Sequence, residues 1–293
     1  MALHLPINGV CNIKCVFCSA QGRSGNYELA ALLDQIDRDK TGHVQISGGD
    51  PMAKDPAELL QILLHCRRRG KLVEFQTNGT MIARYHPKRL KLISGLVDFF
   101  NVNFSAHTPE LDLQVTETPG AFDWRVRGVR QLLSMGATVR LNYIVCELNY
   151  RFCGDFVRFA HRELHGFSWI QFSYCKGMGR AKGNRLVMPR FGDAAPCLNA
   201  AFGLCRELGI DFDVDHIPVC FVIDYKEHHA DYRKMRESRP GVHLSEKQQV
   251  ADCEACAMRE LCPGPRRDYL EIYGPLTQGP LVRPILEPGG RRA

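Results

Sequence analysis

Residues 2–18, ALHLPINGVCNIKCVFC, place a short apolar segment directly before three cysteines. Cys11, Cys15 and Cys18 follow in the pattern C-x3-C-x2-C, so one loop supplies three thiols. Three thiolates at this spacing can hold three corners of a [4Fe–4S] cube and leave one iron open for chemistry. A structural zinc site needs a fourth ligand, and no further cysteine or histidine occurs before His43. The loop therefore favours an iron–sulfur cluster.

The pattern around this loop predicts an α/β fold. Short apolar or β-branched segments predict strands at residues 2–7, 43–47, 72–76, 97–105, 138–145 and 168–174. Amphipathic stretches between them predict helices at residues 28–38, 57–69, 124–134, 155–164 and 194–208. Alternating strands and helices indicate a parallel sheet, and the strands are too apolar for one face to lie in water. Periodicity alone leaves both an open doubly wound sheet and a barrel possible.

Composition narrows the class of protein. The chain has 293 residues, of which 45% are hydrophobic and 24% charged, as in ordinary folded proteins. No apolar run approaches the roughly 20 residues that cross a bilayer, and the N-terminus lacks a signal peptide, so we expect a cytoplasmic protein without a membrane partner. In that compartment the thirteen cysteines should not form disulfides. The net charge of +6 suits an anionic partner, but without a long Lys/Arg run it does not predict nucleic-acid binding.

The pattern changes near residue 216. We expect three parts: an α/β part at 1–215, a small metal-organised domain at 216–273 and an extended Pro/Gly-rich tail at 274–293.

The second part holds the motif Cys253-x2-Cys256-x5-Cys262, with Cys220 as the nearest upstream thiol. Four cysteines can close a zinc site or a complete [4Fe–4S] cube. Zinc ribbons use paired Cys-x2-Cys motifs, and Cys220 has no second cysteine beside it in the sequence. This favours the [4Fe–4S] cube over zinc. His228 and His229 could replace a thiol, although adjacent histidines here are expected on a solvated surface.

The N-terminal motif resembles a known signature. Cys11-x3-Cys15-x2-Cys18, with Phe17 before the third cysteine, looks like that of the radical S-adenosylmethionine (radical SAM) enzymes. Ser47-Gly48-Gly49-Asp50-Pro51, directly after the second strand, is similar to their glycine-rich turn. The resemblance implies a partial (β/α)6 TIM-like barrel over the first 215 residues. It also implies a [4Fe–4S] cluster whose open iron binds SAM, and reductive cleavage of SAM to a 5′-deoxyadenosyl radical that abstracts a substrate hydrogen.

The resemblance also assigns residues to the cofactor. The Gly48-Gly49 turn would lie beside the amino group of SAM, since backbone without side chains allows close approach. A larger residue at Gly49 should then block SAM while the clusters still assemble. Asp50 stands where the family often has Glu, and Phe17 would lie against the adenine, with a core position as the alternative for Phe17.

Three strand-end residues complete the candidate site. The resemblance implies that Ser105, on the fourth strand, and Asn142, on the fifth, contact the ribose and carboxylate of SAM, although either residue could simply end a strand. Cys175 ends the sixth strand, where barrel active sites form. Its thiol could return a hydrogen atom to a substrate radical, and packing as a small buried hydrophobe is the alternative.

The C-terminal cysteines resemble those of the SPASM and shorter twitch extensions, which hold auxiliary [4Fe–4S] clusters. The full SPASM pattern has another cysteine where this chain has Arg266, so we expect one auxiliary cluster, of the twitch type. If Cys220 completes its ligation, the cluster should carry electrons. If Cys220 does not, the cluster could bind substrate.

These expectations give one leading function and several alternatives. The leading hypothesis is a radical SAM enzyme with two [4Fe–4S] clusters and SAM, reduced by a donor such as flavodoxin or ferredoxin. It would oxidise or cross-link a small molecule or a peptide, and because Cys11 comes so early we expect no fused peptide-recognition domain before it. A radical SAM epimerase with a cysteine hydrogen donor is the alternative within the family. A non-catalytic iron–sulfur electron carrier and a zinc-binding protein are alternatives of another class.

Overall fold

One parallel sheet forms the centre of the structure, a computed structural model that describes residues 2–20, 27–239 and 241–276. Its seven strands lie in chain order, and each pairs only with its neighbours in sequence. They are β1 (Leu3–Pro6), β2 (His43–Ser47), β3 (Leu72–Thr77), β4 (Phe99–Asn103), β5 (Val139–Val145), β6 (Trp169–Tyr174) and β7 (Phe212–Asp215). All pairings are parallel, from Pro6 beside Ser47 to Ser173 beside Asp215. The loops that follow the strands therefore gather along one edge, where such sheets form their sites.

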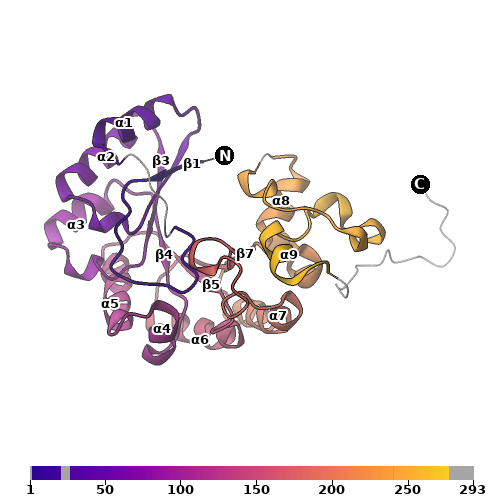
Figure 1. Cartoon of the computed structure of the whole chain (residues 1–293). Helices are drawn as coiled ribbons and strands as arrows, with labels where there is room; N and C mark the ends of the chain where they lie inside the picture. The colour runs from indigo at the N-terminus through magenta and orange to yellow at the C-terminus, as the bar shows by residue number, and fades with distance from the viewer. Residues whose placement is uncertain (1, 21–26, 240, 277–293) are drawn as a thin grey trace.

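Helices make the crossovers that parallel strands require. They are α1 (Leu29–Arg38), α2 (Pro56–Arg68), α3 (Pro87–Ser94), α4 (Pro109–Thr116), α5 (Ala121–Ser134), α6 (Cys153–Glu163) and α7 (Phe191–Glu207). In Figure 1 they follow one another in an arc around the strands. Local sequence sets their starts: the Asp55 side chain accepts hydrogen bonds from the backbone N–H groups of Ala57 and Glu58 at 3.0 and 3.1 Å, which caps α2 ahead of Pro56.

Short 3₁₀ helices fill many of the loops. They are η1 (Pro51–Ala53), η2 (Ile82–Arg84), η3 (Tyr150–Phe152), η4 (Gly179–Ala181), η5 (Val219–His228), η6 (Val242–Leu244), η7 (Ala251–Ala255) and η8 (Arg259–Leu261).

The predicted α/β class with a parallel sheet is confirmed, and all predicted strands and helices form with bounds shifted by a few residues. The sequence did not predict β7, α3 or α4. β7 has only four residues, FDVD, and β6 is the one strand it pairs with in the sheet. α3 and α4 have eight residues each, and the buried positions of α3 are only Leu90 and Ile93. Such short elements carry too little periodicity to be recognised.

The two faces of the sheet differ, contrary to the expectation of strands apolar on both sides. Along β5, Val139, Leu141, Tyr143 and Val145 are buried, and the residues between them are only partly buried. The buried face packs against the helices, as where Phe104 meets Phe156 of α6 with ring centroids 6.2 Å apart. The opposite face carries polar side chains, several of which hydrogen-bond to one another.

Glu74 on β3 is the centre of that polar face. Its carboxylate, almost fully buried, accepts hydrogen bonds from Gln45 and Asn101 at 2.8 Å each and pairs with Arg140 at 2.5 Å. Burial alone would raise the pKa of Glu74, but Arg140 and the amide donors outweigh it, and the pKa is lowered. The stabilisation by this carboxylate is therefore complete above its ordinary pKa and is lost only as the pH falls through its lowered pKa.

The C-terminal part is built from short helices, which include α8 (Ala230–Arg236) and α9 (Arg267–Tyr273). Figure 1 shows it, orange to yellow, beside α7 and β7. Tyr269 of α9 stacks on Phe191 of α7 with ring centroids 3.7 Å apart. A separate small core consists of Val219, Tyr232, Met258 and Cys262. The predicted tail lies outside the described residues beyond Leu276, and the division at 215 and 273 stays a prediction.

No helix within the described ranges is both long and apolar enough to cross a membrane. All thirteen cysteines lie within the described residues, and all are free thiols there.

Arg140→Met should lower the free energy of unfolding by about 3 kcal/mol, because Glu74 would remain buried and charged without its cation. Adding Glu74→Gln should restore part of the loss, since a neutral amide costs less to bury. Denaturant unfolding followed by circular dichroism measures both. Arg130→Met is the matched control: its pair with Glu163 is about half exposed, so the loss should stay below about 1 kcal/mol. Equal losses at Arg130 and Arg140 would contradict this account.

Candidate active site

The cysteine loop that follows β1 is held by backbone hydrogen bonds from distant segments. Lys14 and Val16 donate their N–H groups to the carbonyls of Thr116 and Val115, at the end of α4, at 3.0 and 2.9 Å. From the other side, the N–H of Arg180 donates to the carbonyl of Cys18 at 3.0 Å. The loop therefore depends on tertiary contacts for its shape.

The three predicted cluster ligands lie on this loop as neighbours. Cys11 is exposed, and Cys15 and Cys18 are half-buried. Burial raises the pKa of the Cys15 thiol to about 12; Arg125 opposes this rise, while Cys11 and Cys18 add to it. The thiols are thus close enough to repel one another as thiolates, which a bound cluster would relieve by taking their charge.

The glycine turn after β2 packs directly on the start of this loop. Gly49 and Asp50 donate their N–H groups to the carbonyls of Asn8 and Val10 at 3.0 and 2.7 Å. A Cβ atom on Gly49 would lie 2.0 Å from the Val10 oxygen, and one on Gly48, whose φ is +137°, would lie 2.4 Å from the Asn8 oxygen. Both glycines are therefore required by the cysteine loop itself, whatever they offer to SAM. The expectation that a larger residue at Gly49 leaves cluster assembly intact does not agree with this geometry.

The Asp50 carboxylate supports the glycine turn after β2. Its carboxylate is fully buried and accepts hydrogen bonds from the N–H groups of Met52 and Asn78 and from the Thr77 hydroxyl, at 2.8–3.1 Å. Burial raises the pKa of Asp50, and these donors offset part of the rise. With these donors on both oxygens, the carboxylate orders the turn, and its predicted role as a cofactor contact stays a prediction.

The loop after β3 brings a residue that the sequence analysis missed. The Asn78 amide donates to Cys11 Sγ at 3.6 Å and to Asn12 Oδ1 at 3.0 Å, and Asn12 in turn donates to Thr80 at 2.7 Å. Hydrogen bonds to cluster sulfurs are among the factors that set reduction potential. The only sequence signal was position, since Asn78 directly follows a strand of the parallel sheet.

Two predicted cofactor contacts lie in structural positions instead. Phe17 is buried in the main hydrophobic core. Ser105 is fully buried, and its hydroxyl accepts a hydrogen bond from the Ile144 N–H at 2.9 Å, which ties β4 to β5. For both, the structural alternative considered from the sequence agrees better with the geometry.

Asn142 remains free to bind a ligand. It lies on the polar face of β5, and its Oδ1 atom is buried without a hydrogen-bond partner among the described residues. A buried amide oxygen without a donor costs about 1–3 kcal/mol. A hydroxyl donor such as those of the SAM ribose would satisfy it, so the residue fits the predicted cofactor.

Cys175 is fully buried, and its thiol donates to the Val187 carbonyl at 3.6 Å. This placement favours packing over the predicted role as a hydrogen donor.

The four C-terminal cysteines, far apart in sequence, line one cavity. Cys220, Cys253, Cys256 and Cys262 share it with side chains that include Met258 and Leu276. Burial raises the pKa of Cys220 to about 12, and the other three thiols raise it further. The donor set is four thiols around one cavity, which fits a fully ligated cluster.

Histidine does not take part in this cavity. The ring of His228 stacks on Phe212 with centroids 4.0 Å apart, and His229 accepts hydrogen bonds from the backbone N–H groups at the start of α8. Among the residues that the structure describes, no three His, Cys, Asp or Glu side chains are arranged to hold a single metal ion.

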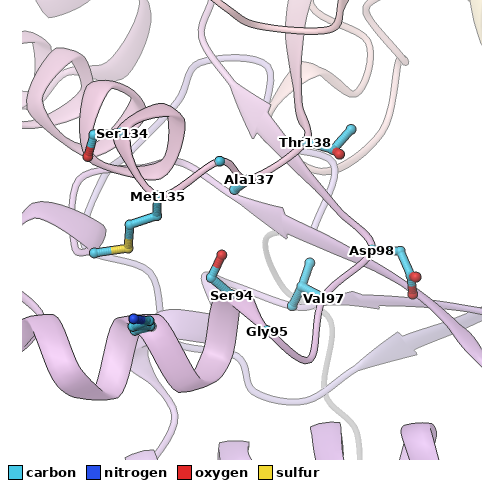
Figure 2. Close-up of a pocket in the computed structure, with 10 residues that line it drawn as sticks. Ser94, Gly95, Val97, Asp98, Ser134, Met135, Ala137 and Thr138 are labelled. Carbon is cyan, nitrogen blue, oxygen red and sulfur yellow. The ribbon is translucent and has the colours of Figure 1, made fainter.

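A hollow of about 560 Å³ lies away from both cysteine sets. It is lined by the turns that precede β4 and β5, with Ser94, Gly95, Val97 and Asp98 on one and Ser134, Met135, Ala137 and Thr138 on the other (Figure 2). These are the N-terminal ends of the strands, opposite the edge that carries the cysteine loop, so the hollow is not part of the candidate site.

Comparison with known proteins places the chain in a family. Residues 5–150, which include the cysteine loop and the glycine turn, match the family model described as Radical SAM superfamily. Fe-coproporphyrin III synthase of Methanosarcina barkeri is 30% identical over 149 residues, 48% of this chain and 36% of that protein. A probable GTP 3′,8-cyclase of Methanothermobacter thermautotrophicus is 26% identical over 188 residues, 61% of this chain and 55% of that protein. Mycofactocin maturase MftC of Mycobacterium tuberculosis is 27% identical over 171 residues, 55% of this chain and 42% of that protein. The chain thus spans about a third to a half of the length of the curated relatives it matches.

Solved structures share the fold. Native anSMEcpe with bound AdoMet superposes with a TM-score of 0.69 at 14% identity, covering 92% of this chain and 90% of that chain. SuiB of Streptococcus suis gives a TM-score of 0.57 at 14% identity, covering 73% and 48%. At such identity the likeness concerns the fold alone. Together, the family match, the named relatives and the three-cysteine loop show that this chain belongs to the radical SAM superfamily, a family that implies a [4Fe–4S] cluster and SAM.

Proposed function

We propose that Cys11, Cys15 and Cys18 hold the catalytic [4Fe–4S] cluster and that SAM binds its open iron beside Asn142. The observation that carries this proposal is the placement of three neighbouring thiols on one loop whose backbone is held by the glycine turn. When bound there, the cluster and SAM supply reductive cleavage to a 5′-deoxyadenosyl radical, which abstracts a substrate hydrogen. The chain contributes the orientation of the thiols, an amide donor to Cys11 from Asn78, and an unpartnered acceptor at Asn142.

We propose further that the sheet is a partial (β/α) barrel whose polar face is the inner one. Arg140 on β5 reaches Glu74 on β3, although β4 lies between them. The helices that follow one another in an arc around the strands in Figure 1 favour a curved sheet with the polar face inside. Residues 1–215 would form this barrel and residues 216–273 a twitch-like domain.

The second cysteine set is proposed to hold one complete auxiliary [4Fe–4S] cluster. Four thiols around one cavity support full ligation, and the histidine alternatives are engaged elsewhere. Arg266, where the SPASM pattern has a further cysteine, is buried and paired with Glu246 and Asp268, which leaves no ligand for another cluster there. A fully ligated cube has no open iron, so its role would be electron transfer.

With an electron acceptor available, we propose oxidation or cross-linking of a small molecule or a peptide, with flavodoxin or ferredoxin as the electron donor. The names of the relatives include a maturase, a cyclase and a synthase, which support this range of substrates without favouring one. The epimerase alternative would need an accessible cysteine donor, and the burial of Cys175 weighs against that thiol.

Replacing Cys11, Cys15 and Cys18 together with Ala should lower the iron content of reconstituted protein from about eight to about four atoms per chain, because one of two four-iron cubes is lost. Formation of 5′-deoxyadenosine from SAM should stop. Iron analysis and chromatography measure both, and Cys66→Ala, which removes a buried thiol of α2, is the control. Stoichiometric zinc, or SAM cleavage that survives the triple substitution, would contradict the proposal.

Cys220→Ala should make the second cluster labile or leave it with an open iron, while SAM cleavage without substrate continues. Electron paramagnetic resonance and Mössbauer spectra of the second cluster report the change, and Cys205→Ala, a buried thiol of α7 outside the cavity, provides the comparison. Spectra identical to those of the unmodified protein would exclude Cys220 as a ligand.

Gly49→Ala should reduce both N-terminal cluster assembly and SAM cleavage about tenfold or more, since its Cβ would press on the Val10 carbonyl next to Cys11. The second cluster, with about four irons, should remain. Gly42→Ala is the matched control, because a Cβ at Gly42 meets nothing within 4 Å. If Gly49→Ala assembles both clusters and cleaves SAM normally, the turn does not support the cysteine loop.

A further inference from the structure

The loop between β6 and α7 contacts both halves of the chain through a short stretch, residues 176–181, called here the bridge segment. Its sequence is KGMGRA. One end lies against the N-terminal cysteine loop and the other against α9. The proposed function assigns no role to this segment.

Toward the cysteine loop, the bridge segment contributes Arg180. Besides its backbone bond to Cys18, its guanidinium donates to the carbonyl of Lys14 and, at 3.4 Å, to that of Cys15. Its other nitrogen pairs with Glu117 at 2.7 Å, beyond the end of α4. The Arg180 side chain thus joins the cysteine loop to the end of α4, whose carbonyls also accept N–H groups of the cysteine loop.

Close backbone approach accompanies these bonds. Gly179 has φ of +56°, and a Cβ there would lie 2.2 Å from the Cys18 carbonyl oxygen. A glycine is required for this contact, so the segment and the loop fit as backbone against backbone.

Toward the C-terminal part, the bridge segment is bound by α9. The Gly177 N–H donates to Asp268 Oδ2 at 2.9 Å, and a Cβ on Gly177 would lie 3.0 Å from the Asp268 Cβ. Arg266 orients Asp268 through bonds of 2.5 and 3.0 Å to its two carboxylate oxygens. Arg266 in turn pairs with Glu246 at 2.5 Å.

This chain of contacts joins the two cysteine sets. Arg266 and Asp268 lie just after Cys262, and Arg180 holds the carbonyls of residues 14 and 15, next to the first cluster's ligands. A guanidinium is always charged, so it also places a fixed positive charge beside a loop with three thiolates.

We propose that Arg180 is a positioning residue for the SAM-cleaving cysteine loop, and that its own placement depends on the Asp268–Gly177 contact with α9. The inference rests on the proposed function of Cys11, Cys15 and Cys18. It makes the geometry of the first cluster dependent on the folding of the C-terminal part.

Arg180→Gln should keep both clusters, raise the KM for SAM and slow SAM cleavage about tenfold, since charge-assisted bonds to two carbonyls are lost. The midpoint potential of the first cluster should fall, because a positive charge that favours the reduced form is gone. Amide hydrogen exchange of residues 9–19 should become faster. Arg180→Lys, which keeps the charge without the fork, should restore the potential more than the KM.

Arg185→Gln is the matched control. Arg185 lies on the same loop and donates to the Ile272 carbonyl of α9 at 2.7 Å, so the potential should stay unchanged, and any shift in KM measures weakened docking of α9 alone. Asp268→Ala should shift KM and exchange in the same direction as Arg180→Gln, but less.

An Arg180→Gln protein with the potential, KM and exchange of the Arg185→Gln control would overturn the positioning role. An unchanged Asp268→Ala protein would overturn the dependence on α9. If the proposed function itself is wrong, the unmodified protein will not cleave SAM. Amide hydrogen exchange would still test the contact of Arg180 with the cysteine loop in that case.

Discussion

The close packing of backbone on backbone around the cysteine loop is the constraint on which the candidate site depends. Gly49 lies against Val10, and Gly179 lies against Cys18, each at a distance that no side chain tolerates. Between these two contacts, the end of α4 accepts the N–H groups of Lys14 and Val16. A loop with three thiols has few side chains of its own to pack, so neighbouring peptide groups determine its shape. Because the loop is already ordered, binding of a cluster does not require a further loss of conformational entropy in the loop.

The parallel sheet makes this packing possible. Because all seven strands point the same way, the turn after β2, the loop after β3 and the bridge segment after β6 reach the same edge and can meet the loop after β1. On the polar face of the sheet, Glu74 and Arg140 form an ion pair that joins β3 to β5. The hollow between the turns before β4 and β5 (Figure 2) lies at the opposite end of the strands, so it is separate from the cysteine loop.

The second cysteine set is built by a different principle. Its core of Val219, Tyr232, Met258 and Cys262 is small, and the four thiols line a cavity there instead of lying on one loop. A core of this size buries little apolar surface, so a bound cluster would supply much of the folding stability of the C-terminal part. The contacts of Asp268 with Gly177 then give this part a second role, as a support for the segment that holds the first cysteine loop.

The sequence by itself determined the α/β class, six of the strands, both cysteine sets and the importance of Gly48 and Gly49. These features are local: alternation of apolar segments, spacing of thiols and a glycine pair after a strand are all readable within a few residues. Only the tertiary structure decided what each neighbouring side chain does. It placed Phe17 in the core, bonded the Ser105 hydroxyl to β5 and put Asp50 under the turn. It also left the Asn142 oxygen without a partner among the described residues, and brought Asn78 and Arg180 to the cysteine loop. Those roles depend on contacts between residues that are dozens of positions apart in the sequence. The hydrogen bonds that satisfy a buried polar group form only when the ends of distant strands lie at the same edge of the sheet.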